Sequence, residues 1–228
     1  MAEDSLARQM SEIHANGEED LANAGPFVAI SREFGCGGFS LGLLLLDLLN
    51  DEAKPTEGWQ IYHKEILDSL AQETDLAPEI LERRRRQKPG LLGNFFQSFS
   101  GKKGVPSGLE IRNRMTAILR ELAIEGRCIL IGQGSVGATA DMPNGLSVRL
   151  EAPEEWRLKQ IAFREGLSET QAKIRIAEEM EKREYLQKIY ERRFSRKPRC
   201  HLTFDCSVFS LAQIATMVYR AIKLKKLV

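Results

Sequence analysis

The sequence predicts an α/β fold with three layers, in which helices cover both faces of a five-stranded parallel sheet. Short apolar runs bounded by glycine or polar residues alternate with longer amphipathic segments. The predicted strands are 27–31, 59–62, 128–131, 146–150 and 202–206. The predicted helices are 41–49, 63–70, 77–86, 109–125, 153–164, 168–194 and 211–224. In such sheets, ligands bind at the carboxyl ends of the strands.

A glycine-rich turn follows the first predicted strand and leads into an apolar helix. This layout can bind phosphate, because glycines let backbone N–H groups face an anion at a helix N-terminus. The full phosphate-loop signature has a lysine and then Ser or Thr after its second glycine. If Gly37 is that second glycine, Gly38 stands at the lysine position and Phe39 at the Ser/Thr position, with Ser40 one residue later. The pattern alone is equally consistent with a tight strand-to-helix turn that binds no ligand.

Length and charge limit the class of protein. A chain of 228 residues has the size of one domain, or of one domain with a lid. Its net charge of +1 gives no general attraction to nucleic acid or to an anionic membrane. Scattered cysteines without a Cys-x-x-Cys pair, no transmembrane run and no secretory signal predict a cytoplasmic protein with reduced thiols.

Three further segments stand out by their composition. Residues 1–25 form a polar N-terminal extension, and 26–228 form the predicted domain. The run Arg83–Arg86 is either a solvated helix end or an anion patch. The segment 87–108 is a long loop whose phenylalanines could anchor it, form a dimer contact or cover a ligand.

The most charged segment lies between the fourth and fifth predicted strands. Ser168 and Gln171 form a predicted capping box, and a long helix follows it. Arginines and lysines alternate with glutamates along this helix, which is typical of an exposed, salt-bridged helix. An arginine lid over a phosphate site, spanning roughly 157–197, explains the same pattern, and the glycine turn favours that lid.

Four motifs, in this order, resemble the cytidylate kinase-like family: Ile30–Gly38, Ile61–Ile66, Cys128–Gly134 and Arg149–Arg157. The resemblance extends from Phe27 to the C-terminus. It implies a P-loop kinase fold of the nucleoside-monophosphate-kinase type with a helical lid. It also implies ATP as donor, Mg²⁺, and a pyrimidine nucleotide as acceptor.

The resemblance and the charges together nominate the site residues. The phosphate-loop positions are Gly35, Cys36, Gly37, Gly38, Phe39 and Ser40. The resemblance maps the lid arginines to Arg157, Arg164 and Arg183. Arg32 or one of these lid arginines would replace the missing lysine, and Ser40 offers a hydroxyl for Mg²⁺. We therefore predict Arg32, Arg157, Arg164 and Arg183 as catalytic residues.

Departures from the family pattern leave two functions open. Neutral or altered residues stand at Phe39, His63 and Gln133, where the family carries charge. The first hypothesis is a kinase that transfers the γ-phosphoryl of ATP to a pyrimidine nucleoside monophosphate. The alternative is a nucleotide-binding regulatory protein of the same fold with weak or no catalysis. We expect a nucleotide substrate, no specific nucleic acid and no membrane partner, and leave a homodimer open.

Overall fold

A computed structural model of the chain describes residues 24–51, 58–63, 108–132, 134–193 and 199–228. Predictions for residues 1–23 of the extension, for the helices over 64–70 and 77–86, for the loop up to residue 107 and for Gln133 lie outside these residues.

The centre of the fold is a five-stranded parallel sheet, as the sequence predicts. The structure gives its strand order, β2-β3-β1-β4-β5. Its strands are β1 (Phe27–Arg32), β2 (Gln60–Tyr62), β3 (Cys128–Ile131), β4 (Gly145–Glu151) and β5 (Leu202–Asp205). β1 is the middle strand, and it pairs with β3 on one side and β4 on the other. The residues that follow β1 therefore leave the sheet between two neighbouring strands.

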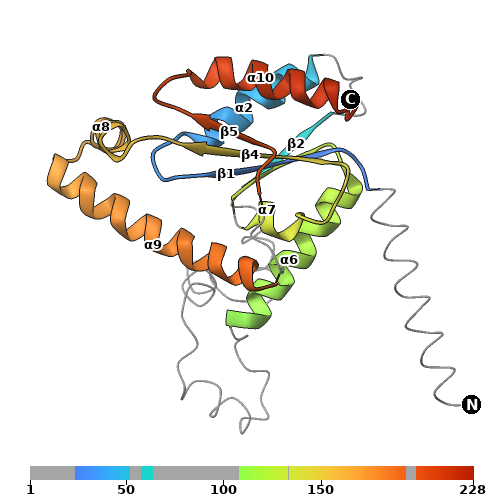
Figure 1. Cartoon of the computed structure of the whole chain (residues 1–228), viewed down its shortest axis with the longest axis horizontal. Coiled ribbons are helices and arrows are strands. Elements are labelled where there is room, and N and C mark those ends of the chain that lie inside the picture. The colour runs from blue at the N-terminus through green and yellow to red at the C-terminus, as the bar shows by residue number, and fades with distance from the viewer. Residues whose placement is uncertain (1–23, 52–57, 64–107, 133, 194–198) are drawn as a thin grey trace, which may run out of the picture.

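Helices cover both faces of the sheet (Figure 1). The helices are α2 (Gly38–Asn50), α6 (Gly108–Glu125), α7 (Ser135–Ala138), α8 (Glu154–Glu165), α9 (Glu169–Arg193) and α10 (Leu211–Leu224). α2 and α10 lie on one face, and α6 and α7 lie on the other. α8 and α9 extend from one end of the sheet, and α9 runs back beneath it toward α6.

Successive side chains of β1 point to opposite faces of the sheet, and each face has its own apolar core. Val28 and Ile30 pack with α2 and α10, whereas Phe27 and Ala29 pack with α6. All four side chains are at most 2% exposed, as expected for a strand covered on both faces. A third, smaller cluster around Ile161 joins α8 to α9 and includes Phe34 of the glycine turn.

Capping boxes in the sequence explain where α9 and α10 begin. The Ser168 hydroxyl accepts a hydrogen bond from the Gln171 N–H (3.3 Å), and the Gln171 side chain accepts one from the Ser168 N–H (3.0 Å), which confirms the predicted capping box. The same arrangement, not predicted, begins α10 at Ser210 and Gln213. α2 begins at Gly38, earlier than predicted, and α7 has no counterpart among the predicted elements.

Candidate functional site

The glycine turn connects β1 to α2 and orients the start of that helix. Gly37 adopts the left-handed conformation (φ 67°) and is the N-cap of α2. The first backbone hydrogen bond after this cap joins the Leu41 N–H to the Gly37 carbonyl (3.0 Å). The N–H groups of Gly38, Phe39 and Ser40 therefore project from the end of the helix, where they can bind an anion.

Residues from the carboxyl ends of all the other strands contact this turn or Arg32, which precedes it. His63 follows β2, and its Nε2 atom lies 2.9 Å from a guanidinium nitrogen of Arg32. Ala152 follows β4, and its N–H donates to the carboxylate of Glu33 (3.3 Å). Cys206 follows β5, and its thiol donates to the Cys36 carbonyl (3.7 Å). The turn after β3 contributes Gly132, which packs against the Arg32 guanidinium.

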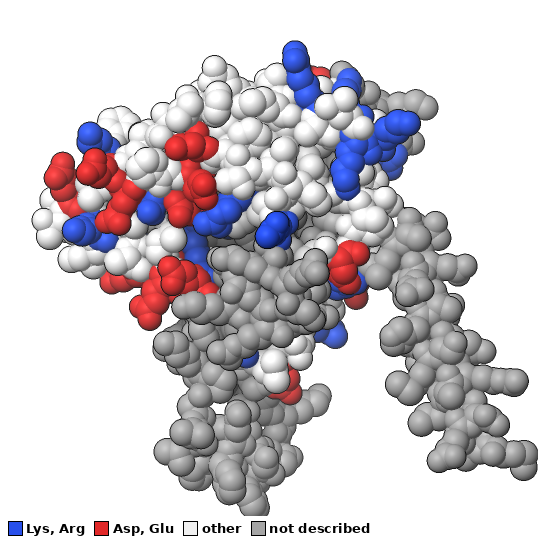
Figure 2. Space-filling view, in the orientation of Figure 1, with Lys and Arg blue, Asp and Glu red and all other residues white. Residues whose placement is uncertain are grey.

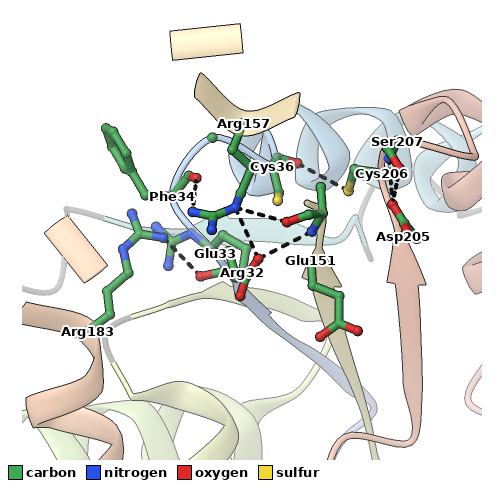
Figure 3. A network of polar contacts seen from close by, with 12 residues as sticks. Arg32, Glu33, Phe34, Cys36, Glu151, Arg157, Arg183, Asp205, Cys206 and Ser207 are labelled. Carbon is green, nitrogen blue, oxygen red and sulfur yellow. Dashed lines mark hydrogen bonds and ion pairs between the residues drawn. The ribbon is translucent and has the colours of Figure 1, made fainter. Parts of the chain in front are cut away.

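Glu33 fixes the glycine turn to the start of α8 (Figure 3). Its carboxylate lies 3.2 Å from Nε of Arg157 and 3.7 Å from a guanidinium nitrogen of Arg149. Arg157 is buried, and it also donates to the Ala152 carbonyl (3.0 Å) and to the Phe34 carbonyl (3.4 Å). The carboxylate of Glu33 therefore faces Arg157, and its ion pair holds the glycine turn in position.

Two further hydrogen bonds to the backbone and two contacts with the Phe34 ring join this region to α8 and α9. Arg164 donates to the Gly35 carbonyl (3.1 Å), and Arg183 donates to the Arg32 carbonyl (2.9 Å). The guanidinium groups of Arg175 and Arg183 each lie 5.3 Å from the centre of the Phe34 ring. These contacts bring α9, the predicted lid helix, against the glycine turn in this structure.

Arg32 lies beneath the turn in a cationic environment. Burial and the nearby positive charge of Arg183 lower the pKa of Arg32 to about 9, whereas Glu179 raises it. The fall in pKa means that burial and Arg183 make the charged form of Arg32 less stable than it is in water. Two guanidinium groups at the carboxyl end of β1 repel each other and would both attract a phosphate group.

The cysteine of the turn is a packed structural residue. Cys36 is 1% exposed, and its hydrogen bond with Cys206 and its burial raise the pKa of Cys36, which keeps it a neutral thiol. Cys36, Cys128, Cys200 and Cys206 are all free thiols, as predicted. Of the predicted phosphate-loop residues, Cys36 can therefore contribute its backbone to an anion site but not a thiolate.

The structure brings all four predicted catalytic arginines to the glycine turn, but in different settings. Arg157 and Arg164 bind backbone carbonyls of the turn, and Arg157 has little exposed surface. Arg32 and Arg183 are close enough for their charges to interact. Phe39 is 43% exposed, and its ring centre lies 5.6 Å from that of His63.

The sequence pattern does not predict the roles of Glu33, Phe34 and Gly132. All three belong to the motifs that resemble the family, and their positions directly after strands are the only local signal. Their partners come from distant parts of the chain, so spacing along the sequence could not identify them.

The described residues carry few groups that could hold a metal ion. Within the described ranges, no group of three or more His, Cys, Asp or Glu side chains could do so. Ser40 is exposed at the start of α2 and offers one hydroxyl. This fits Mg²⁺, which proteins commonly hold by few side chains together with substrate phosphates and water.

Charges of both signs are mingled over the α8 and α9 end of the molecule (Figure 2). Arg175 lies 3.5 Å from Glu165 and 3.1 Å from Glu179, so part of this charge is paired within the helices. Among the described helices, none is both long and apolar enough to cross a membrane.

Comparisons with known proteins agree with this architecture. A model of the cytidylate kinase-like family matches residues 27–208. The match covers most of the chain, and the chain therefore belongs to the cytidylate kinase-like family. A comparison with curated proteins finds no match.

Solved structures resemble the chain at low sequence identity. An uncharacterized protein from Eubacterium ventriosum is 18% identical with a TM-score of 0.59, and the alignment covers 87% of this chain and 98% of that one. Shikimate kinase from Acinetobacter baumannii, in complex with shikimate, is 17% identical with a TM-score of 0.47, over 90% of this chain and 96% of that one. The first likeness shows a shared fold. With the parallel sheet and the family match, the predicted three-layer kinase fold is confirmed.

Proposed function

We propose that this protein is an ATP-dependent kinase that transfers the γ-phosphoryl group of ATP to a pyrimidine nucleoside monophosphate. One observation carries the proposal: a glycine turn, a helix N-terminus and the guanidinium groups of Arg32 and Arg183 lie together at the carboxyl end of the central strand. Phosphoryl transfer depends on positioning and on neutralising charge, and these groups supply both. The family supports the kinase class and the pyrimidine acceptor.

The residues of the turn divide into two roles. The N–H groups of Gly38, Phe39 and Ser40 bind phosphate oxygens of ATP, and Arg32 and Arg183 offset their negative charge. Ser40 would hold Mg²⁺ together with phosphate oxygens, and the bound ion would neutralise negative charge on the group that is transferred. Arg157 and Arg164 act as positioning residues, because their hydrogen bonds hold the Phe34 and Gly35 carbonyls away from the anion.

The test is a panel of nucleoside monophosphates incubated with ATP and Mg²⁺ and scored for ADP. The proposal expects ADP formation that depends on the acceptor and is greatest with CMP or UMP. A Ser40→Ala variant should lower turnover and the affinity for Mg²⁺, while ATP still binds. ADP formation that is independent of every monophosphate would contradict the proposed kinase reaction.

A second candidate is a nucleotide-binding protein with weak or no catalysis. It is favoured by the neutral Gly38 and by the exposed ring of Phe39 at the start of α2. Tight ATP binding in calorimetry without acceptor-dependent turnover would support this candidate over the kinase.

A further inference from the structure

We propose that Arg32 supplies, from the end of β1, the phosphate-binding cation that the phosphate-loop signature supplies with a lysine at position 38. The inference rests on the proposed function and names the cation of that same site. It also gives a reason for the glycines at positions 38 and 132.

The sequence carries the two key residues in exchanged positions. The signature runs Gly, four residues, Gly, Lys. With Gly37 as its second glycine, the first glycine falls at position 32 and the lysine at position 38. This chain has Arg32 at the first of these positions and Gly38 at the second. These three positions therefore hold two glycines and one cation, as in the signature, but the cation stands at the end of the strand.

The structure shows that the side chain of Arg32 occupies the space beside residue 38. A Cβ atom added to Gly38 would lie 3.0 Å from both Cγ and Cδ of Arg32, and 3.3 Å from its Nε. A Cβ atom added to Gly132 would overlap the Arg32 guanidinium outright. The Arg32 side chain therefore lies between the start of α2 and the turn after β3. A side chain at position 132 would displace its guanidinium, and one at position 38 would press on its stem.

The charges around Arg32 favour an anion as its partner. Arg183 is close enough to repel it, and Arg183 also donates to the Arg32 carbonyl (2.9 Å). His63 contacts the guanidinium through Nε2 (2.9 Å), and Glu179 offsets part of the positive charge. A phosphate group at the N-terminus of α2 would reduce the repulsion between the two guanidinium groups, as a bidentate partner of Arg32.

The test exchanges the two residues and measures the binding of tripolyphosphate and ATP by calorimetry. Arg32→Gly removes the cation and should weaken binding about 10- to 100-fold, the effect of losing one charge-assisted hydrogen bond. Adding Gly38→Lys to Arg32→Gly restores the signature and should recover most of the lost affinity. The matched control combines Arg32→Gly with Gly38→Met, which has similar bulk and no charge, and should stay weak.

Folding is checked by circular dichroism and thermal unfolding of every variant. If Arg32→Gly does not fold, Arg32→Gln replaces it, because glutamine keeps an aliphatic stem and a hydrogen-bonding end and lacks the charge. The same loss of affinity is expected from it. Recovery with lysine but not with methionine supports the proposal.

Three outcomes separate this inference from the proposed function. Folded variants without the arginine that bind both ligands as tightly as the parent overturn the inference and leave the kinase proposal standing. A lysine variant that binds as weakly as its folded methionine control also overturns the inference. A parent protein that binds neither tripolyphosphate nor ATP overturns the proposed function, and the inference with it.

Discussion

Glu33 is the only acidic residue of the glycine turn, and its contacts are with α8 and β4. The side chain of Arg157 is 9% exposed and that of Glu33 is 19% exposed, so water screens this pair only in part. A carboxylate facing an anion site would repel phosphate, whereas here its charge stabilises a buried arginine. The side-chain orientation of a single residue thus keeps the turn suitable for anions.

Replacing Glu33 with Gln should destabilise the fold. Glu33→Gln keeps the size of the side chain but leaves Arg157 without its charge partner, and we expect a loss of about 1–3 kcal/mol in the free energy of unfolding. Urea denaturation measures this loss. The control is Glu151→Gln, because Glu151 also pairs with an arginine (3.3 Å) but is 48% exposed, and its loss should stay below about 1 kcal/mol. Equal losses in the two variants would contradict the positioning role of Glu33.

At the scale of elements, α8 and α9 differ in how they meet the glycine turn. α8 is fixed to the turn by Arg157 and Arg164 and ends at Gly166, which has a left-handed conformation (φ 64°). α9 begins at Glu169, and its polar contacts with the turn are made by the ends of long side chains at Arg175 and Arg183. If the helical segment closes over a nucleotide, α9 is therefore the part that should move.

Hydrogen exchange should distinguish these two helices. Amides of α9 should gain protection when ATP and CMP are both present, because lids come from the less stable parts of a fold. Amides of α8 should change little, since this helix is already bonded to the turn, and they serve as the internal control. Equal gains in both helices would mean that they move as one body, and no gain in either would support a static, salt-bridged α9.

The pairing of β4 with the residue before β5 should give stability a dependence on pH. The Nδ1 atom of His201 accepts a hydrogen bond from the backbone N–H of Ser147 (2.9 Å), and the backbone N–H of His201 donates to the Ser147 hydroxyl (3.0 Å). Burial, and then the charge of Lys225, lower the pKa of His201 below its usual 6.5. Just below pH 6.5 the unfolded chain therefore binds more protons than the folded protein. The free energy of unfolding is accordingly greater above that pH and decreases as the pH falls.

Urea unfolding of the parent and of a His201→Gln variant, at about pH 5 and about pH 7.5, tests this dependence. The parent should lose more stability on acidification than the variant, because glutamine does not titrate. Both proteins carry the same carboxylates, so the difference between their losses of stability does not come from carboxylate titration. Parallel losses in both would contradict a role for His201.

Most elements could be predicted because their signals are local. β3 is predicted at its observed bounds, Cys128–Ile131, by an apolar run between polar and glycine residues, and α10 by its amphipathic period. α7 has four residues, too few to show a helical period. The glycine turn is contiguous and could be found, whereas Arg157 and Arg164 bind carbonyls 123 and 129 positions away. Only the folded chain reveals such contacts.

At the scale of the whole molecule, the order of the strands determines what the glycine turn can reach. β1 is central, so its carboxyl end lies between the ends of β3 and β4, and the other two strands end nearby. The two large cores hold the sheet and its covering helices, and the third cluster holds α8 against α9. Phe34 belongs to this third cluster although it comes from the turn after β1. It is therefore a link between the helical end of the molecule and the sheet.

Phe34→Ala should weaken this link without weakening the sheet. The ring packs in the third cluster and contacts two guanidinium groups, so its loss should lower the free energy of local opening of α9 by about 1–3 kcal/mol. Native-state hydrogen exchange measures this opening in α9 and, separately, in β1 and β3. The matched control is Phe163→Ala on α8, whose ring is 88% exposed and should matter little. Equal losses in α9 and in the central strands would instead mean that the helical end and the sheet unfold as one cooperative unit.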